Sequence, residues 1–267
     1  MTVSIDFDAL YVAKAMADAA RDAIDPHFRS LKNIENKLDG ARFDPVTEAD
    51  KAAERAMRAV LQDLRPDDAI FGEEYGRTDG STGWTWVLDP IDGTRAFVAG
   101  LPTWTSLIGL VDEAGDAIVG LIDQPTLDER YIGGPDGSAL ITSARESSIT
   151  VSACKDLREA VIATTDPFIM TPAEQGAWTH LRHTARIVRY GLDAYAYARL
   201  AAGTVDLVAE AGLAPYDAAA LIPVVRGAGG LACDWRGNPA KPGGQLVCAA
   251  STEILDQALI SLRRSAT

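Results

Sequence analysis

An apolar run leads directly into two carboxylates in the segment 86–95, which reads WVLDPIDGTR. Residues 86–88 predict a buried strand that ends at Asp89, and Asp92 follows after a proline and an isoleucine. The glycine after Asp92 permits a positive φ, and Thr94 is placed to begin a helix whose first N–H groups favour an anion. Carboxylates for a hard cation and amides for a phosphate indicate metal-assisted phosphoryl chemistry, but the same residue types also form ordinary turns. Both interpretations are open on this segment alone.

Apolar spacing and turn-forming residues predict the organisation of the first half of the chain. Residues 5–30 and 47–64 have apolar positions at helical spacing, with Thr47 as the expected N-cap of the second helix. The segment between them, 31–46, predicts a loop or a short hairpin. Short strands are expected at 69–72, 84–89, 104–111, 117–123, 129–133, 138–141 and 148–152. The strands from residue 84 onward predict one antiparallel sheet that is covered by the two helices.

Beyond residue 155, strands and helices alternate, which favours an α/β arrangement. Strands are expected at 161–163, 186–188 and 205–209, and helices at 172–182, 194–202 and 217–228. We therefore expect the fold class α/β, with an α+β N-terminal lobe (1–148) and an α/β C-terminal lobe (149–267). No linker separates them, so the two lobes should pack as one body.

Composition and charge argue against several classes of function. The chain has 267 residues, of which 47% are hydrophobic, as in ordinary globular proteins. Its net charge of −13 argues against a nucleic-acid-binding surface, which needs a basic patch. The three cysteines, Cys154, Cys233 and Cys248, have no metal-ligand or disulfide spacing, which favours a reducing cytoplasm. No signal sequence and no apolar run of the ~20 residues needed to span a bilayer is visible, so no membrane partner is expected.

Four further carboxylates lie at predicted element ends. Glu73 and Glu210 follow predicted strands, and Asp50 and Asp217 lie at predicted helix starts, Asp217 at the start of the last long helix. Each could be an exposed turn residue or a partner of the helix dipole. Together they recur where α/β folds build their sites, at strand ends and helix starts.

In their order along the chain, these segments resemble the motifs of the inositol monophosphatase family, within the superfamily that includes fructose-1,6-bisphosphatase. The matching segments are VTEAD at 46–50, GEE at 72–74, WVLDPIDGT at 86–94 and YDAAA at 216–220, with a glycine-rich turn at 227–230. The resemblance spans nearly the whole chain. It implies a layered αβαβα sandwich and a Mg²⁺-dependent hydrolysis of phosphate monoesters.

The resemblance also implies two to three Mg²⁺ ions per site. Glu73, Asp89 and the Ile91 carbonyl would hold one ion. Asp89, Asp92 and Asp217 would hold a second, and a third, weaker ion is expected near Glu73. The N-terminal lobe would thus carry most of the metal ligands, and the C-terminal lobe the last one together with the substrate-recognition residues.

Catalytic roles follow from the same resemblance. The backbone N–H groups of Gly93 and Thr94 would bind the phosphate. Thr94 and Asp50 would orient and help deprotonate the metal-bound water that attacks phosphorus, close to the metal ligand Glu73. The second metal would stabilise the leaving alkoxide.

The substrate is the least determined feature. The segments 189–197 and 214–225 look like the histidinol-phosphate phosphatase branch of the family, although this chain has Leu192-Asp193-Ala194 where that branch often has Gly-Asp-Cys. Asp193 and Glu210 would provide carboxylates for the cationic part of histidinol phosphate. Alternatively, Glu210 would bond the hydroxyls of a polyol, and Asp193 would only cap the following helix.

Three functional hypotheses remain open at this point. The preferred one is a histidinol-phosphate phosphatase of histidine biosynthesis. The second is an inositol-1-monophosphatase or a phosphatase of broad specificity, and the third is a catalytically idle homologue that binds metal as a regulatory module. For the preferred hypothesis we expect a cytoplasmic homodimer whose partner is a small phosphorylated metabolite.

Overall fold

The computed structural model describes residues 7–30, 35–36, 45–46 and 48–267. The elements up to Ser148 are α1 (Phe7–Ile24), β1 (Glu35–Asn36), β2 (Pro45–Val46), α2 (Glu48–Leu64), β3 (Ala69–Gly72), β4 (Gly76–Thr78), β5 (Thr85–Asp92), α3 (Thr94–Val98), β6 (Thr105–Val111), β7 (Ala117–Gln124), β8 (Glu129–Gly134), β9 (Gly137–Ile141) and β10 (Glu146–Ser148). After residue 160 follow β11 (Val161–Thr164), α4 (Pro172–Thr184), β12 (Ile187–Tyr190), α5 (Tyr195–Ala201), β13 (Leu207–Leu213), α6 (Pro215–Ala218), α7 (Leu221–Gly227), β14 (Leu231–Cys233), β15 (Gly244–Ala249) and α8 (Thr252–Leu262).

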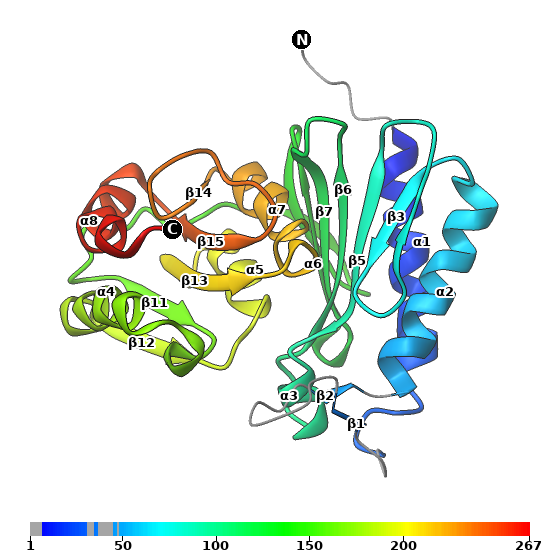
Figure 1. The fold of residues 1–267 in the computed structure, drawn as a ribbon, viewed down its shortest axis with the longest axis horizontal. Coiled ribbons are helices and arrows are strands. Elements are labelled where there is room, and N and C mark those ends of the chain that lie inside the picture. Colours follow the sequence, from blue (N-terminus) through cyan, green and yellow to red (C-terminus); the bar gives the residue numbers. More distant parts are fainter. Residues whose placement is uncertain (1–6, 31–34, 37–44, 47) are drawn as a thin grey trace.

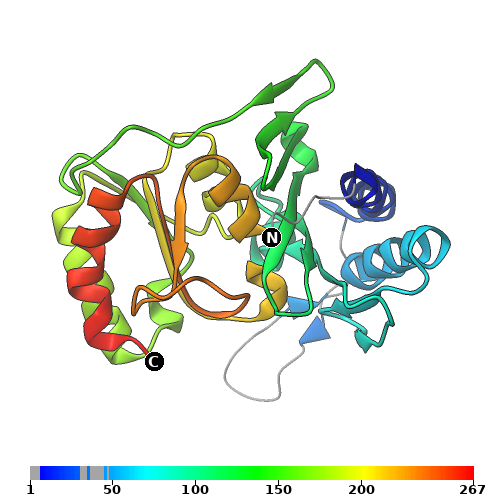
Figure 2. The same cartoon turned by 90° about the horizontal axis from the view of Figure 1, so that it is seen from above.

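Two large sheets and three layers of helices make up the molecule (Figure 1). The first sheet has eight strands in the order β10-β9-β8-β7-β6-β5-β3-β4, and the second has five in the order β12-β11-β13-β15-β14. Helices α1 and α2 cover the outer face of the first sheet, and α4 and α8 cover the outer face of the second (Figures 1 and 2). Helices α5, α6 and α7 lie between the sheets. The predicted layered αβαβα sandwich is confirmed.

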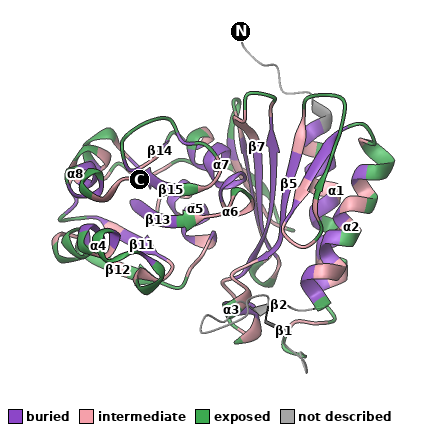
Figure 3. Ribbon diagram, viewed as in Figure 1, coloured by how far each residue is buried: buried purple, intermediate pink, exposed green. Residues whose placement is uncertain are grey.

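Helix α2 shows how the sequence places these layers. Its buried positions include Ala49, Ala53, Met57 and Leu61, four residues apart, so one face of the helix is apolar. That face packs on the first sheet, and the opposite face is exposed (Figure 3). The central core, between the two sheets, is built mainly from α5, α7 and the strands that face them. Within the described residues, no helix has the length and apolar character that crossing a bilayer requires.

The structure corrects the predicted first half in three places. The first helix ends at Ile24 instead of residue 30, and the last strand lies at Glu146–Ser148 instead of 148–152. The strands from β5 to β10 pair antiparallel as predicted, but the sheet is larger than expected, because β3 joins it parallel to β5 and β4 adds a further edge strand. The predicted hairpin region contains the antiparallel pair β1–β2, whereas the Thr47 N-cap and most of the 31–46 segment lie outside the described residues.

The second half differs from the prediction at the segments that build the site. Glu210 lies inside β13, which continues to Leu213, and does not close a strand that ends at residue 209. The single helix expected at 217–228 is two short helices, α6 and α7, because the chain turns at Ala219 and Ala220. Asp217 is the third residue of the short helix α6. The last long helix is α8, and neither this helix nor the strands β14 and β15 were predicted from the sequence.

Candidate active site

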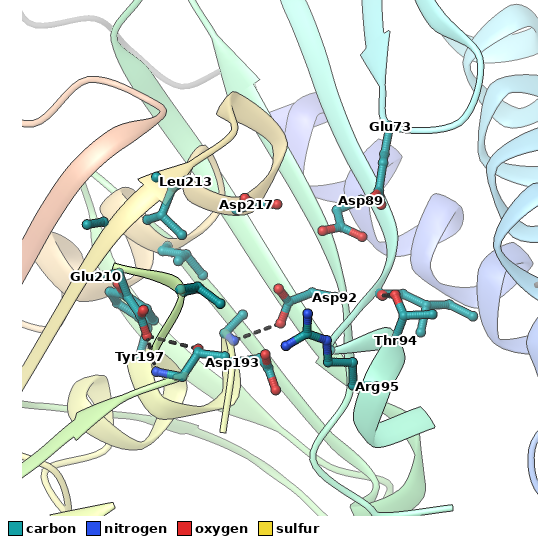
Figure 4. Close-up of a pocket in the computed structure, with 18 residues that line it drawn as sticks. Glu73, Asp89, Asp92, Thr94, Arg95, Asp193, Tyr197, Glu210, Leu213 and Asp217 are labelled. Atoms are coloured by element: carbon teal, nitrogen blue, oxygen red, sulfur yellow. Dashed lines mark hydrogen bonds between the residues drawn. The ribbon is translucent and has the colours of Figure 1, made fainter. Parts of the chain in front are cut away.

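A cavity of about 250 Å³ opens between the two sheets. The ends of β3 and β5 and the start of α3 form one side of it, and β13, α5 and α6 form the other (Figure 4). Its lining residues are Glu73, Asp89, Ile91, Asp92, Gly93, Thr94, Arg95, Thr165, Ile169, Asp193, Ala194, Tyr197, Glu210, Ala211, Gly212, Leu213, Asp217 and Leu221. All the predicted site residues except Asp50 therefore line one cavity. Asp50 is fully buried near the start of α2.

An irregularity in β5 brings its two carboxylates to the same side. Residues three apart in a regular strand face opposite sides of the sheet. Here the pairing of β5 with β6 runs regularly to Asp89, shifts register, and resumes at Asp92 opposite Thr105. The Pro90 carbonyl in this irregular stretch accepts a hydrogen bond from the Ser106 hydroxyl at 2.6 Å. Because the bulge adds a residue to one strand only, Asp89 and Asp92 both turn towards the cavity.

Asp217 completes a cluster of three carboxylates with Asp89 and Asp92. One oxygen from each of the three lies within 4.8 Å of the others. The Oδ2 atom of Asp217 accepts a 2.7 Å hydrogen bond from the backbone N–H of Ala214, which fixes the side chain at the start of α6. Glu73, from the end of β3, lies against Asp89 (Figure 4).

Burial makes this cluster electrostatically unfavourable without a cation. Burial raises the pKa of Asp89 well above its ordinary value, and the negative charges of Glu73, Asp92 and Asp217 raise it further. Burial and the charge of Asp193 also raise the pKa of Asp92. The Oδ1 atom of Asp89 is buried and accepts no hydrogen bond from any residue that the structure describes. An all-oxygen donor set with an unused buried lone pair fits a hard divalent cation, which would resolve the repulsion.

Asp92 also connects the two halves of the cavity. Its Oδ2 accepts a 2.7 Å hydrogen bond from the backbone N–H of Ala194, which lies 102 residues away in the sequence, at the start of α5. The Thr105 hydroxyl approaches the same oxygen at 3.4 Å. With Oδ2 held by the Ala194 amide, Oδ1 of Asp92 remains available for a metal.

Gly93 and Thr94 form the turn that starts α3. Gly93 is the N-cap residue and has φ +80°, a conformation that favours glycine. A Cβ atom at position 93 would lie 3.1 Å from Oδ2 of Asp193, so a side chain there would also crowd the cavity. The Thr94 hydroxyl donates to the Ile91 carbonyl at 3.1 Å. The hydroxyl oxygen of Thr94 therefore keeps its lone pairs for another donor.

Two carboxylates lie on the side of the cavity away from Glu73 and Asp89 (Figure 4). Glu210 accepts hydrogen bonds from the backbone N–H and the hydroxyl of Thr165, at 2.7 and 2.9 Å, and burial raises its pKa to about 7. Burial likewise raises the pKa of Asp193 to about 6, although the Arg95 guanidinium acts in the opposite direction. Asp193 does not cap α5: it precedes the N-cap residue Ala194 and has a left-handed φ of +47°.

Sequence reasoning assigned no role to several residues of the cavity wall, among them Arg95, Thr165 and Tyr197. Arg95 is the last residue of the segment 86–95 and follows the Gly-Thr pair directly, and Thr165 follows strand β11, but neither was given a function from the sequence. Tyr197 has the spacing of a core residue and is buried, yet it also lines the cavity. A polar residue just after a predicted strand, as at Thr165, is the signal that could have been used.

Comparison with known proteins agrees with this geometry. Residues 8–267 match the inositol monophosphatase family. The chain is 40% identical over 262 residues to the bifunctional phosphatase IMPL2, chloroplastic, of Arabidopsis thaliana, covering 94% of this chain and 74% of that protein. It is 35% identical over 259 residues to the histidinol-phosphatase of Mycobacterium tuberculosis, covering 96% and 98% of the two chains.

Solved structures agree as well. An inositol monophosphatase from Zymomonas mobilis superposes with a TM-score of 0.86 at 38% identity, covering 97% of this chain and 99% of that one. Other relatives are named inositol-1-monophosphatase or Nus factor SuhB. The match over nearly the full length confirms the predicted family and enzyme class: the chain belongs to the inositol monophosphatase family and is a phosphoric monoester hydrolase.

Proposed function

We propose that this chain hydrolyses L-histidinol phosphate to L-histidinol and phosphate in a Mg²⁺-dependent reaction. The observation that carries the proposal is the pair Asp193 and Glu210, which face the cavity on the side away from the metal-binding carboxylates. A phosphate held at Gly93 would direct the leaving group towards this pair. The leaving group of histidinol phosphate carries an ammonium and an ionisable imidazole, for which two carboxylates are suitable partners.

The proposed metal ligands are those that the family resemblance implies. Glu73, Asp89 and the Ile91 carbonyl would hold one Mg²⁺, and Asp89 together with Asp92 and Asp217 would hold another, with room for a third, weaker ion near Glu73. When bound, the ions would supply Lewis-acid stabilisation of charge on the phosphoryl oxygens and lower the pKa of coordinated water. The buried, unused Oδ1 of Asp89 supports this assignment.

The remaining roles belong to protein groups around the phosphate. The amides of Gly93 and Thr94 would bind its oxygens. Thr94, whose proton is already donated to the Ile91 carbonyl, would accept a hydrogen bond from the attacking water and so orient it. Asp50 keeps the predicted role of helping to deprotonate that water. Because Asp50 does not line the cavity, it would act through Thr94: as Thr94 takes the proton of the water, its own hydroxyl proton would leave the Ile91 carbonyl and pass to Asp50.

Substrate recognition would use the raised pKa values of the two distal carboxylates. Asp193 and Glu210 titrate near neutral pH because they are buried, so each is poorly solvated when ionised. A cationic leaving group would hold both in the ionised form. A neutral polyol would have to leave one or both of them protonated or unpaired, at a cost in binding free energy.

The test is a comparison of kcat/KM for histidinol phosphate and inositol 1-phosphate at saturating Mg²⁺. We expect histidinol phosphate to be preferred, and Asp193→Asn to lower its kcat/KM by about 10- to 100-fold, the loss of one charge-assisted hydrogen bond. Asparagine tolerates the left-handed φ at this position, so the change removes charge without adding backbone strain. Hydrolysis of inositol 1-phosphate should change little.

A matched control is Asp166→Asn, which removes one negative charge near the cavity mouth from a residue that does not line it.

Equal or better turnover of inositol 1-phosphate by the wild type would favour the inositol-phosphatase or broad-specificity alternative. Phosphate release that is unchanged in Asp92→Asn would contradict the proposed site. No release from any phosphate ester would favour a regulatory, metal-binding homologue.

The remaining proposals concern the setting of the enzyme. We propose a cytoplasmic homodimer whose partner is a small phosphorylated metabolite and not a nucleic acid. We also propose that the chain divides into the lobes 1–148 and 149–267. The end of the first sheet at Ser148 and the start of the second at Val161 support this boundary.

A further inference from the structure

A polar cluster outside the cavity joins the first sheet to helix α5. Its members are Glu129 and Tyr131 from β8, and Tyr195 and Arg199 from α5. The Oε2 atom of Glu129 accepts hydrogen bonds from the hydroxyls of Tyr131, at 2.6 Å, and Tyr195, at 2.8 Å. Arg199 donates to the Tyr131 hydroxyl at 2.8 Å and lies 3.8 Å from the Glu129 carboxylate. Two phenols and a guanidinium thus share one carboxylate across the boundary between the two halves.

The side chains of this cluster are partly to fully shielded from solvent. The side chain of Glu129 is 21% exposed and that of Arg199 27% exposed, while Tyr131 is fully buried. A hydrogen bond to a shielded carboxylate is stronger than one at the surface, because solvent competes less for the acceptor. The contact between Tyr195 and Glu129 is therefore a firm attachment of α5 to β8.

The attachment point is adjacent to the residue that contacts the proposed metal site. Tyr195 is the first residue of α5, and the backbone N–H of the preceding residue, Ala194, donates to Oδ2 of Asp92. Ala194 has no side-chain cap bond of its own, and Asp193 before it has a strained left-handed φ. Contacts with other elements therefore hold this turn in place, and the Tyr195 hydroxyl provides one of them, to Glu129 on β8.

None of the four members of the cluster lines the active-site cavity. They cannot touch a substrate bound there, so any effect on the reaction must pass through the backbone of α5. The path is short: Glu129 holds Tyr195, Tyr195 fixes the first turn of α5, and the Ala194 amide holds one oxygen of Asp92.

We propose that Tyr195 and Glu129 are positioning residues, which hold the Ala194 amide on Asp92 and so leave the other oxygen of Asp92 directed at the metal. The inference rests on the proposed function, since it takes Asp92 as a Mg²⁺ ligand. Partners that orient a metal ligand typically contribute about 10- to 100-fold to metal affinity. Tyr195 and Glu129 act on Asp92 only through the backbone of Ala194, so we expect the loss of their hydrogen bond to weaken metal binding by an amount at the lower end of that range.

The experiment compares Tyr195→Phe with Tyr131→Phe in the full chain. Both remove one hydroxyl from Glu129. Tyr131→Phe also removes the hydrogen bond from Arg199, which lies further along α5, whereas only Tyr195→Phe releases the first residue of α5 from that carboxylate. Mg²⁺ binding is measured by calorimetry, and exchange of the Ala194 amide by hydrogen–deuterium exchange. Tyr11→Phe, at a position 62% exposed on α1, is the background control.

We expect Tyr195→Phe to raise the Mg²⁺ dissociation constant about tenfold and to speed exchange at Ala194, with Tyr131→Phe and Tyr11→Phe within about twofold of wild type. Glu129→Leu, which removes the shared acceptor, should reproduce the Tyr195→Phe result. Wild-type affinity in Tyr195→Phe, or equal losses in Tyr195→Phe and Tyr131→Phe, would overturn the proposal. A wild-type protein that binds no Mg²⁺ would instead refute the proposed function, and with it the positioning role of Tyr195 and Glu129.

Discussion

Glu210 is a carboxylate that the protein keeps out of water in the middle of a strand. It is fully buried, and its partners are Thr164 and Thr165, whose hydroxyls and one amide donate to it. These hydrogen bonds lower its pKa, but burial outweighs them and leaves the pKa at about 7. In free solution a glutamate titrates near 4.3, so the folded protein binds the proton more tightly than the unfolded chain does.

This difference predicts a pH dependence of stability. Because the folded pKa is raised, the contribution of Glu210 is fully favourable below about pH 4.5 and is lost as pH rises through 7, by about 3 kcal/mol on the scale of 1.36 kcal/mol per pKa unit. Glu210→Gln cannot ionise, so its Tm relative to wild type should rise between pH 5 and pH 8. Thermal unfolding in EDTA across that range checks this, and parallel Tm–pH curves would contradict it.

At the scale of the element, helix α2 supports the turn at 72–74 through Glu54, a residue that belongs to none of the sequence motifs. Glu54 is fully buried on α2, and its carboxylate accepts hydrogen bonds from the backbone N–H groups of Glu74, at 2.6 Å, and Tyr75, at 3.2 Å. Arg58 donates to it at 2.7 Å. A Cβ atom on Gly72 would overlap the same carboxylate, which explains the glycine of that motif. The turn that presents Glu73 is thus built against α2.

We therefore predict that Glu54→Ala lowers the free energy of unfolding by about 3 kcal/mol, because Arg58 and two amides lose a buried acceptor. It should also weaken Mg²⁺ binding, because the turn that carries Glu73 loosens. Glu48→Ala on the same helix, whose side chain is 68% exposed, is the matched control and should stay within about 0.5 kcal/mol. Urea unfolding of the metal-free protein measures both, and similar losses in the two variants would be inconsistent with this account.

At the scale of the whole molecule, a row of glycines sets the distance between the first sheet and helices α6 and α7. Gly109, Gly120 and Gly133 are directly opposite one another on β6, β7 and β8. A Cβ on Gly109 would lie 2.7 Å from the Ala219 side chain, and one on Gly120 would overlap the Ala220 carbonyl. The backbone of α6 and α7 therefore approaches the sheet directly, which brings Asp217 within reach of Asp89.

Widening this contact should affect both folding and the metal site. Gly120→Ala meets backbone that cannot rotate away, so we expect a loss of about 1–3 kcal/mol in stability and weaker Mg²⁺ binding as Asp217 moves out. Gly176→Ala is the control: it lies in α4 with nothing within 4 Å, and should gain about 0.5–1 kcal/mol from helix propensity. Denaturant midpoints and Mg²⁺ titrations distinguish the two variants, and unchanged Mg²⁺ affinity in Gly120→Ala would refute the coupling.

Much of the fold follows from local patterns that need no tertiary information. The apolar stripe of α2 and the turn residues between the strands β5 to β9 are local patterns. The bounds predicted from them for this helix and these strands lie close to the observed ones. The errors lie where packing overrides spacing. One helical pattern over 217–228 became α6 and α7 because the chain bends to fit against the glycine row, and Glu210 is enclosed by a strand that pairing with β15 extends to Leu213.

By itself, the sequence determined which residues could do chemistry: Asp89, Asp92 and Thr94 sit in one short segment whose turn is encoded by Pro90 and Gly93. It could not determine how they are oriented or which distant groups complete them. The register shift in β5, the Ala194 amide on Asp92 and the Glu54 carboxylate under Gly72 all depend on contacts between segments far apart in the chain. Local sequence sets the propensity for an element, whereas the packing of two sheets against shared helices decides which residues meet.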